Sequence, residues 1–148
     1  MQMWNLKKSI NLSLFITYLF MLILVAMIFL MPWMVSWYVE TMGRDENLPT
    51  FIMVAFYPCV PFCAITLWSL RSFLINVKKN EIFEQKNVRH TRVISNCCMI
   101  VALITFVGGF YYNPFYLVCL AAAFFFLNAR IIANVLETEV QNRENSEK

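Results

Sequence analysis

Four long apolar runs dominate this chain of 148 residues and constrain its fold more than any other feature. They cover residues 10–38, 50–77, 93–110 and 114–135, and short polar segments separate them. A helix of about 20 predominantly apolar residues crosses the hydrocarbon core of a bilayer. The pattern therefore predicts an all-α membrane protein, with a single domain in which four transmembrane helices form a bundle.

The composition excludes an ordinary soluble domain. Hydrophobic residues make up 60% of the chain and charged residues 14%, against about 45–50% and about 25% in soluble domains. A soluble domain of this length could not bury so much apolar surface. The net charge of +3 comes from basic residues beside the apolar runs. This placement indicates the lipid bilayer as a partner and gives no indication of nucleic-acid binding.

The first run is longer than a crossing requires. A cleavable signal peptide has an apolar region of only about 7–15 residues, whereas this run continues to Trp33, Trp37 and Tyr38. Aromatic residues of this kind gather at the interface between membrane and water. We therefore expect a retained first span that is tilted or projects beyond the bilayer.

Two prolines interrupt the second run. Pro58 and Pro61 free backbone groups that neighbouring helices or waters must satisfy in a membrane. One interpretation is a single helix that is kinked, or broken into a re-entrant segment, at these prolines. Another is that Pro58 opens the true span and that residues 50–57 lie along the interface. We favour one kinked helix.

The third and fourth runs are joined by a very short connection. The pairs Gly108-Gly109 and Asn113-Pro114 punctuate it, and so short a link makes two long helices antiparallel neighbours. Small residues let helices approach closely in lipid, so we expect packing around Cys97-Cys98 and residues 121–123. The polar tail, residues 137–148, is expected to fray.

The distribution of lysine and arginine predicts the orientation of the chain. The first connection holds only Arg44, and the link between the third and fourth spans holds neither residue type. Because basic residues concentrate on the cytoplasmic side, both termini and the central loop are expected there. The other basic residues are Lys7, Lys8, Arg71, Lys78, Lys79, Lys86, Arg89, Arg92, Arg130, Arg143 and Lys148.

Catalytic and metal-binding patterns do not emerge from the sequence, and we predict no catalytic residue, no metal ligand and no cofactor. No carboxylate falls within a predicted span, which argues against a proton relay or an ion-driven carrier. His90, the single histidine, has no metal-ligand or nucleophile pattern around it. The five cysteines lie in apolar runs, where they act as small packing residues. A metal or redox role for the Cys59–Cys63 pair is the alternative.

Two asparagines lie inside the predicted spans. Asn96 and Asn128 both fall toward the cytoplasmic half of neighbouring helices. Hydrogen bonds between helices are expected of them, each contributing about 0.6 kcal/mol. Alternatively, they line a ligand site together with the helix kink at Pro58 and Pro61.

The central polar segment, residues 78–92, is the most informative stretch. It is expected to form a turn around residues 79–83 and then the helical start of the third span. Ile82 and Phe83 are apolar residues inside this charged loop. We expect them to dock the loop against the ends of the helices.

Within this segment, Glu81-Ile82-Phe83 is followed by the pair Asn87-Val88 and by the basic residues Arg89 and Arg92. With this pattern the segment resembles bacterial membrane proteins catalogued as domain of unknown function 2975. The resemblance implies four spans in a bacterial plasma (inner) membrane, and it brings no assigned activity. Genes of the family often neighbour a small helix-turn-helix regulator, and this association implies a role in membrane signalling or stress response.

Two positions depart from the family pattern. Asn80 stands where the family often has glycine, and Glu84 where it often has serine or threonine. Asparagine tolerates the left-handed backbone that glycine adopts. Glutamate favours a helix N-terminus through the helix dipole. The local structure is therefore expected to survive both changes.

Our leading hypothesis is a non-enzymatic protein that acts by contact with a protein partner or with copies of itself. The candidate contact residues are Ile82, Phe83, Asn87, Arg89 and Arg92. The alternative is binding or transport of a lipid or small molecule between the spans, by one chain or by an oligomer. A membrane enzyme with a thiol nucleophile is a third hypothesis.

Overall fold

A computed structural model describes residues 2–43 and 47–146, with backbone alone for residues 2–7. The described residues form four helices and no strand: α1 (Gln2–Met42), α2 (Leu48–Lys78), α3 (Gln85–Gly109) and α4 (Pro114–Ser146). Each helix is long and apolar enough to cross a membrane. The prediction of an all-helical, multi-pass membrane protein is confirmed.

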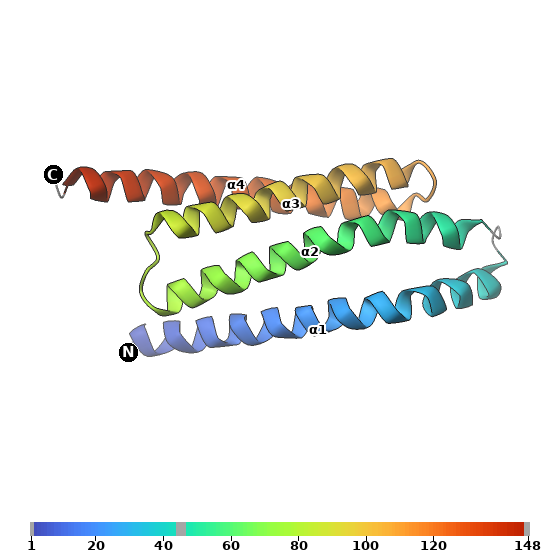
Figure 1. Ribbon diagram of the computed structural model, residues 1–148, viewed down its shortest axis with the longest axis horizontal. Helices are drawn as coiled ribbons and strands as arrows, with labels where there is room; N and C mark the ends of the chain where they lie inside the picture. The colour runs from blue at the N-terminus through green and yellow to red at the C-terminus, as the bar shows by residue number, and fades with distance from the viewer. Residues whose placement is uncertain (1, 44–46, 147–148) are drawn as a thin grey trace.

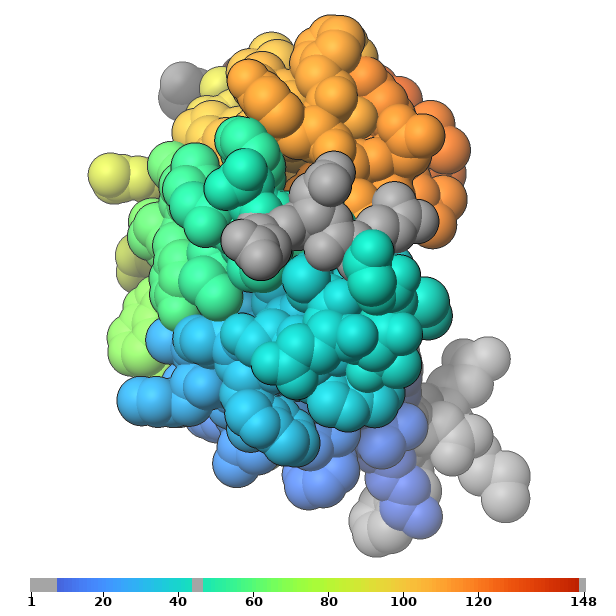
Figure 2. Space-filling model, turned by 90° about the vertical axis from the view of Figure 1, so that its right-hand side faces the viewer, coloured from blue at the N-terminus to red at the C-terminus, as the bar shows by residue number. Residues whose placement is uncertain are grey.

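The helices run antiparallel to their neighbours in chain order (Figure 1). Both termini and the α2–α3 loop (residues 79–84) share one end, here called the basic end, and the other two connections share the opposite end. Within the described part of the chain, backbone contacts join only consecutive helices. Figure 2, a view along the helices, shows α1 and the α3–α4 pair on opposite sides of the molecule.

Two helices extend beyond the predicted spans. α1 continues to Met42, and α4 continues to Ser146. The prediction that the polar tail frays is therefore wrong for residues 137–146. The reason is packing, because Val140 is buried against Val88 of α3. α2 is one continuous helix through Pro58 and Pro61, as the favoured interpretation predicts, and does not begin at Pro58.

The α3–α4 pair has the most extensive helix interface, as the small residues of these helices predicted. Its seam follows a three-four spacing on both helices, the pattern by which long helices pack side by side. Ser95 donates a hydrogen bond from Oγ to the carbonyl oxygen of Phe126 at 3.4 Å. The buried and half-buried seam residues are Val88, Thr91, Ser95, Cys98, Ala102, Thr105 and Gly109 on α3, and Phe115, Cys119, Ala122, Phe126, Ala129, Ala133, Leu136 and Val140 on α4.

Polar and aromatic contacts between helices mark two levels. Toward the basic end, Arg71 Nε donates to Tyr18 Oη at 2.7 Å; at the opposite end, Tyr112 Oη and Tyr38 Oη are 3.2 Å apart. Also at that end, the Phe51 ring of α2 stacks on the Tyr111 ring, with 4.9 Å between their centres. About 20 residues of α1 separate Tyr18 from Tyr38, and a similar stretch of α2 separates Phe51 from Arg71. At 1.5 Å per residue each stretch measures about 30 Å, the thickness of the hydrocarbon core.

Close approach of α3 and α4 beside their turn requires glycine at position 109. A Cβ atom there would lie 2.6 Å from Cε1 of Tyr116. We predict that Gly109→Ala lowers the free energy of unfolding by about 1–3 kcal/mol, because the Tyr116 ring must move. Denaturation in mild detergent measures this loss. The same substitution in a Tyr116→Ala background should cost much less; an equal cost in both backgrounds would contradict the explanation.

Candidate functional site

The α2–α3 loop begins with a left-handed residue. Asn80 has a φ of 65°, the conformation expected where the family often has glycine. This turn returns the chain toward α2, and the backbone N–H of Glu81 donates to the carbonyl oxygen of Asn76 at 3.0 Å. The turn predicted for residues 79–83 is confirmed.

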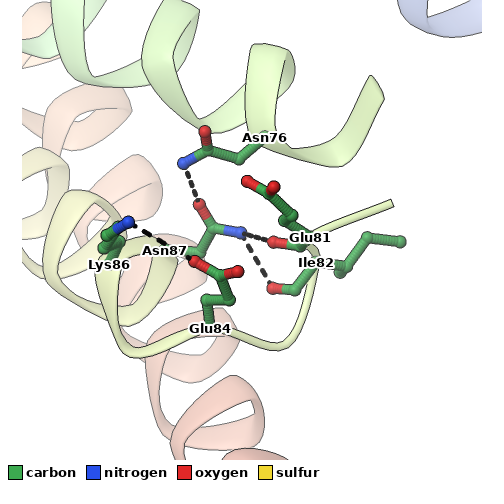
Figure 3. A network of polar contacts seen from close by, with 6 residues as sticks. All are labelled: Asn76, Glu81, Ile82, Glu84, Lys86 and Asn87. Carbon is green, nitrogen blue, oxygen red and sulfur yellow. Dashed lines mark hydrogen bonds and ion pairs between the residues drawn. The ribbon is translucent and has the colours of Figure 1, made fainter. Parts of the chain in front are cut away.

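Asn87 lies at the centre of the loop and is fully buried, with 0% of its surface exposed. Its Oδ1 accepts a hydrogen bond from Asn76 Nδ2 at 2.8 Å. Its Nδ2 donates to the carbonyl oxygens of Glu81 at 2.6 Å and Ile82 at 2.9 Å (Figure 3). One amide thus joins the end of α2, the loop and the start of α3.

Glu84 precedes the first turn of α3 and has an extended backbone, with φ −112° and ψ 147°. Its carbonyl oxygen accepts from the backbone N–H of Asn87 at 2.9 Å. Its carboxylate lies 3.8 Å from the Lys86 ammonium group, and both side chains are exposed. A surface ion pair of this kind contributes little, so the Asn87 amide is the principal polar contact of the loop.

An apolar cluster between α3 and α4 packs against the loop. Val88 of α3 packs with Leu136 and Val140 of α4, and Phe73 and Ile82 pack against this group. Ile82 therefore docks the loop against the helix ends, as predicted. Because two of the buried residues belong to α4, the C-terminal part of that helix is part of the site.

Phe83 remains at the surface, with 38% of the residue exposed. The Arg143 guanidinium carbon lies 4.1 Å from the centre of the Phe83 ring, in a cation–π contact. Arg143 Nε also donates to Glu139 Oε1 at 3.3 Å, one turn earlier on α4. Phe83 is thus covered on one face by α4 and open on the remainder.

The basic residues of the site differ in what they contact. Arg89 and Arg92 are both exposed, and Arg92 also forms an ion pair with Glu137 of α4. Both arginines and Asn96 border a hollow of about 270 Å³ beside the loop. The five predicted contact residues therefore meet at one end of the molecule, but Ile82 and Asn87 support it from inside, and Phe83 and Arg89 face outward.

The predicted interhelical role of Asn128 is wrong. Its Nδ2 donates to the carbonyl oxygen of Phe124 in its own helix at 2.8 Å, and the residue is exposed. Side-chain contacts between α3 and α4 come instead from Ser95, which donates to the carbonyl oxygen of Phe126, and from Arg92, which pairs with Glu137. Pro58 lines an apolar cavity of about 530 Å³ between α2 and α3 that includes neither Asn96 nor Asn128.

Sequence reasoning missed Asn76 and the C-terminal part of α4. The signal for α4 was present, because Ala129, Ala133, Leu136 and Val140 follow the three-four spacing of a packed helix face. Charged residues between them concealed this pattern. Asn76 offered no comparable signal, since its partner lies across a turn whose path depends on Asn80.

The five cysteines are free thiols that differ in burial. Cys59 and Cys97 are buried, and Cys59 Sγ lies 3.3 Å from the carbonyl oxygen of Ala55 in the preceding turn. Among the residues that the structure describes, no group of three or more histidine, cysteine or acidic side chains could hold a metal ion.

These features define a class: a four-helix membrane protein whose polar loop is ordered by a buried amide. The chain belongs to the family described as protein of unknown function (DUF2975), whose model matches residues 15–137. The resemblance seen in the central segment is thereby confirmed, and the match includes all four helices in whole or in part. No curated protein matches the chain, and no solved structure does.

The Asn87 amide should be essential for the order of the loop. Asn87→Ala leaves Asn76 and two loop carbonyls without their partner, at about 1–3 kcal/mol for each buried group. We expect a clear fall in unfolding temperature and faster hydrogen exchange at residues 79–84. Asn96→Ala, which removes an exposed amide from the same helix, should change stability by no more than about 0.5 kcal/mol. Equal effects of the two substitutions would refute this role for Asn87.

Proposed function

We propose that this protein is a non-enzymatic component of a bacterial plasma (inner) membrane that acts by binding another protein. The α2–α3 loop and the adjoining surface of α3 are its docking element. The observation that carries the proposal is the fully buried Asn87 amide, which holds the loop in one conformation while Phe83 stays at the surface.

Preorganisation favours binding. A loop that is already ordered loses little conformational freedom when a partner docks. Aromatic and arginine side chains are the residue types that contribute most to protein interfaces, and here Phe83 and Arg89 face outward. Lys79 and Lys86 are exposed on the same segment. The chemistry of this surface fits a partner that offers an apolar pocket bordered by carboxylates.

The proposed orientation places this surface in the cytoplasm, with both termini. Its support is the distribution of charge in the sequence: of the twelve lysines and arginines, only Arg44 falls between the first two spans, and none falls between the third and the fourth. Retention of basic residues on the cytoplasmic side is the general rule for membrane helices. A soluble regulator, a neighbouring membrane protein or a second copy of the chain could reach the loop there.

A specific observation supports a second candidate function, the binding of an apolar molecule. All four helices line a groove of about 500 Å³ in the middle of the molecule. Its lining is almost entirely apolar, and Thr66 is one of its few polar side chains. A groove of this volume and chemistry fits a hydrocarbon chain or a small apolar ligand.

The docking proposal is tested by extracting the tagged protein gently from its native membrane and quantifying the proteins that accompany it. A stoichiometric partner is expected with the unchanged chain. Phe83→Ala and Arg89→Ala should each reduce its recovery at least severalfold, because they remove outward-facing contacts and leave Asn87 in place.

Phe110→Ala is the matched control, since Phe110 is an exposed aromatic residue at the opposite end of the molecule. It should leave partner recovery unchanged. Equal recovery with all three variants would refute the docking element. Recovery of the chain without a protein partner but with a bound apolar molecule would favour the groove instead.

A further inference from the structure

Arg71 occupies an unusual place in α2. The helix carries no charged residue from Leu48 to Leu70, a stretch long enough to cross the hydrocarbon core, for which about 20 residues suffice. Arg71 is the first charge after that crossing. It therefore lies at the level where the hydrocarbon ends and the phosphates of the lipid head groups begin.

Two aromatic residues hold the Arg71 guanidinium group. Its Nε donates to Tyr18 Oη at 2.7 Å. Its central carbon lies 5.5 Å from the centre of the Tyr18 ring and 5.3 Å from that of the Trp68 ring. Tyr18 is 48% exposed and Trp68 is 61% exposed. The group is thus fixed on an open flank of the α1–α2 pair.

No carboxylate neutralises this charge within the described part of the chain. The ion pairs found there involve Lys86, Arg92 and Arg143. In α1 and α2 the sole acidic residue is Glu40, at the opposite end of α1 from Tyr18. An arginine that is oriented by aromatic rings but has no anion on the protein is suited to an external anion.

We propose that Arg71, Tyr18 and Trp68 form a binding site for the phosphate group of an anionic phospholipid. The Arg71 Nη groups donate to two phosphate oxygens as a planar fork. The Tyr18 hydroxyl accepts from Nε and donates its own proton to the same phosphate. Trp68 places its ring at the interface, where indole rings are favoured.

Lys78 extends the site toward the head group. It follows Arg71 by seven residues, or about two helical turns, and therefore lies on the same face of α2. Its side chain is exposed. This second cation favours a lipid with net negative charge over a zwitterionic lipid, whose own ammonium group already balances its phosphate. The site is independent of the docking element and of the protein partner proposed above.

The test uses purified protein in nanodiscs of phosphatidylcholine alone or with increasing phosphatidylglycerol. We expect phosphatidylglycerol to raise the unfolding temperature of the unchanged protein and to remain bound during delipidation followed by native mass spectrometry. Arg71→Gln should weaken phosphatidylglycerol retention about tenfold, the effect of losing one charge-assisted hydrogen-bonded contact. Tyr18→Phe should weaken retention to a smaller degree.

Arg130→Gln is the matched control, because Arg130 is an exposed arginine on a different helix, α4. It should retain phosphatidylglycerol as the unchanged protein does. The proposal is overturned if Arg71→Gln and Arg130→Gln retain equal amounts of phosphatidylglycerol. It is also overturned if the unchanged protein does not prefer phosphatidylglycerol to phosphatidylcholine. If Arg71→Gln does not fold, the Tyr18→Phe variant provides the test. Phosphatidylglycerol retention by Tyr18→Phe equal to that of the unchanged protein then overturns the proposal.

Discussion

The constraint on which this structure depends is the cost of placing a polar group in hydrocarbon about 30 Å thick. Within the spans, most polar side chains avoid this cost by hydrogen bonding to the backbone of their own helix. Thr66 donates to the carbonyl oxygen of Phe62, and Thr105 donates to that of Val101. Contacts between polar side chains from different elements occur instead toward the two ends of the molecule. Toward the basic end Arg71 contacts Tyr18, Asn76 contacts Asn87 and Arg92 contacts Glu137, and at the opposite end Tyr38 contacts Tyr112. Inside the crossing, small residues and aromatic rings join the helices.

Beyond the level of Arg71, polar and apolar contacts combine into a small ordered structure. The Asn87 amide satisfies the loop backbone, and Leu136 and Val140 of α4 supply the apolar support beneath it. The basic end therefore combines polar and apolar contacts, whereas contacts between helices in the membrane-embedded part are mainly apolar. Specific recognition is therefore best placed at the basic end, with a protein at the loop and a lipid phosphate on the α1–α2 flank.

The features that depend on local chemistry were predictable from the sequence. The four helices follow from the length of the apolar runs, and the left-handed turn at Asn80 follows from the tolerance of asparagine for that backbone. The features that depend on long-range packing were not. The helical state of residues 137–146 depends on contacts of Val140 with α3, and the Asn76–Asn87 bond depends on the reversal between two helices.

The central claim is that the chain crosses the membrane four times and that its basic end lies in the cytoplasm. Labelling of single cysteines tests this claim most directly. In a chain whose five native cysteines are changed to alanine, Glu40→Cys, Lys79→Cys and Asn113→Cys each place one thiol at an exposed position. In intact spheroplasts, a membrane-impermeant maleimide should label positions 40 and 113, and position 79 only after permeabilisation. Labelling of position 79 in intact spheroplasts, or of positions 40 and 113 from different sides, would contradict the account.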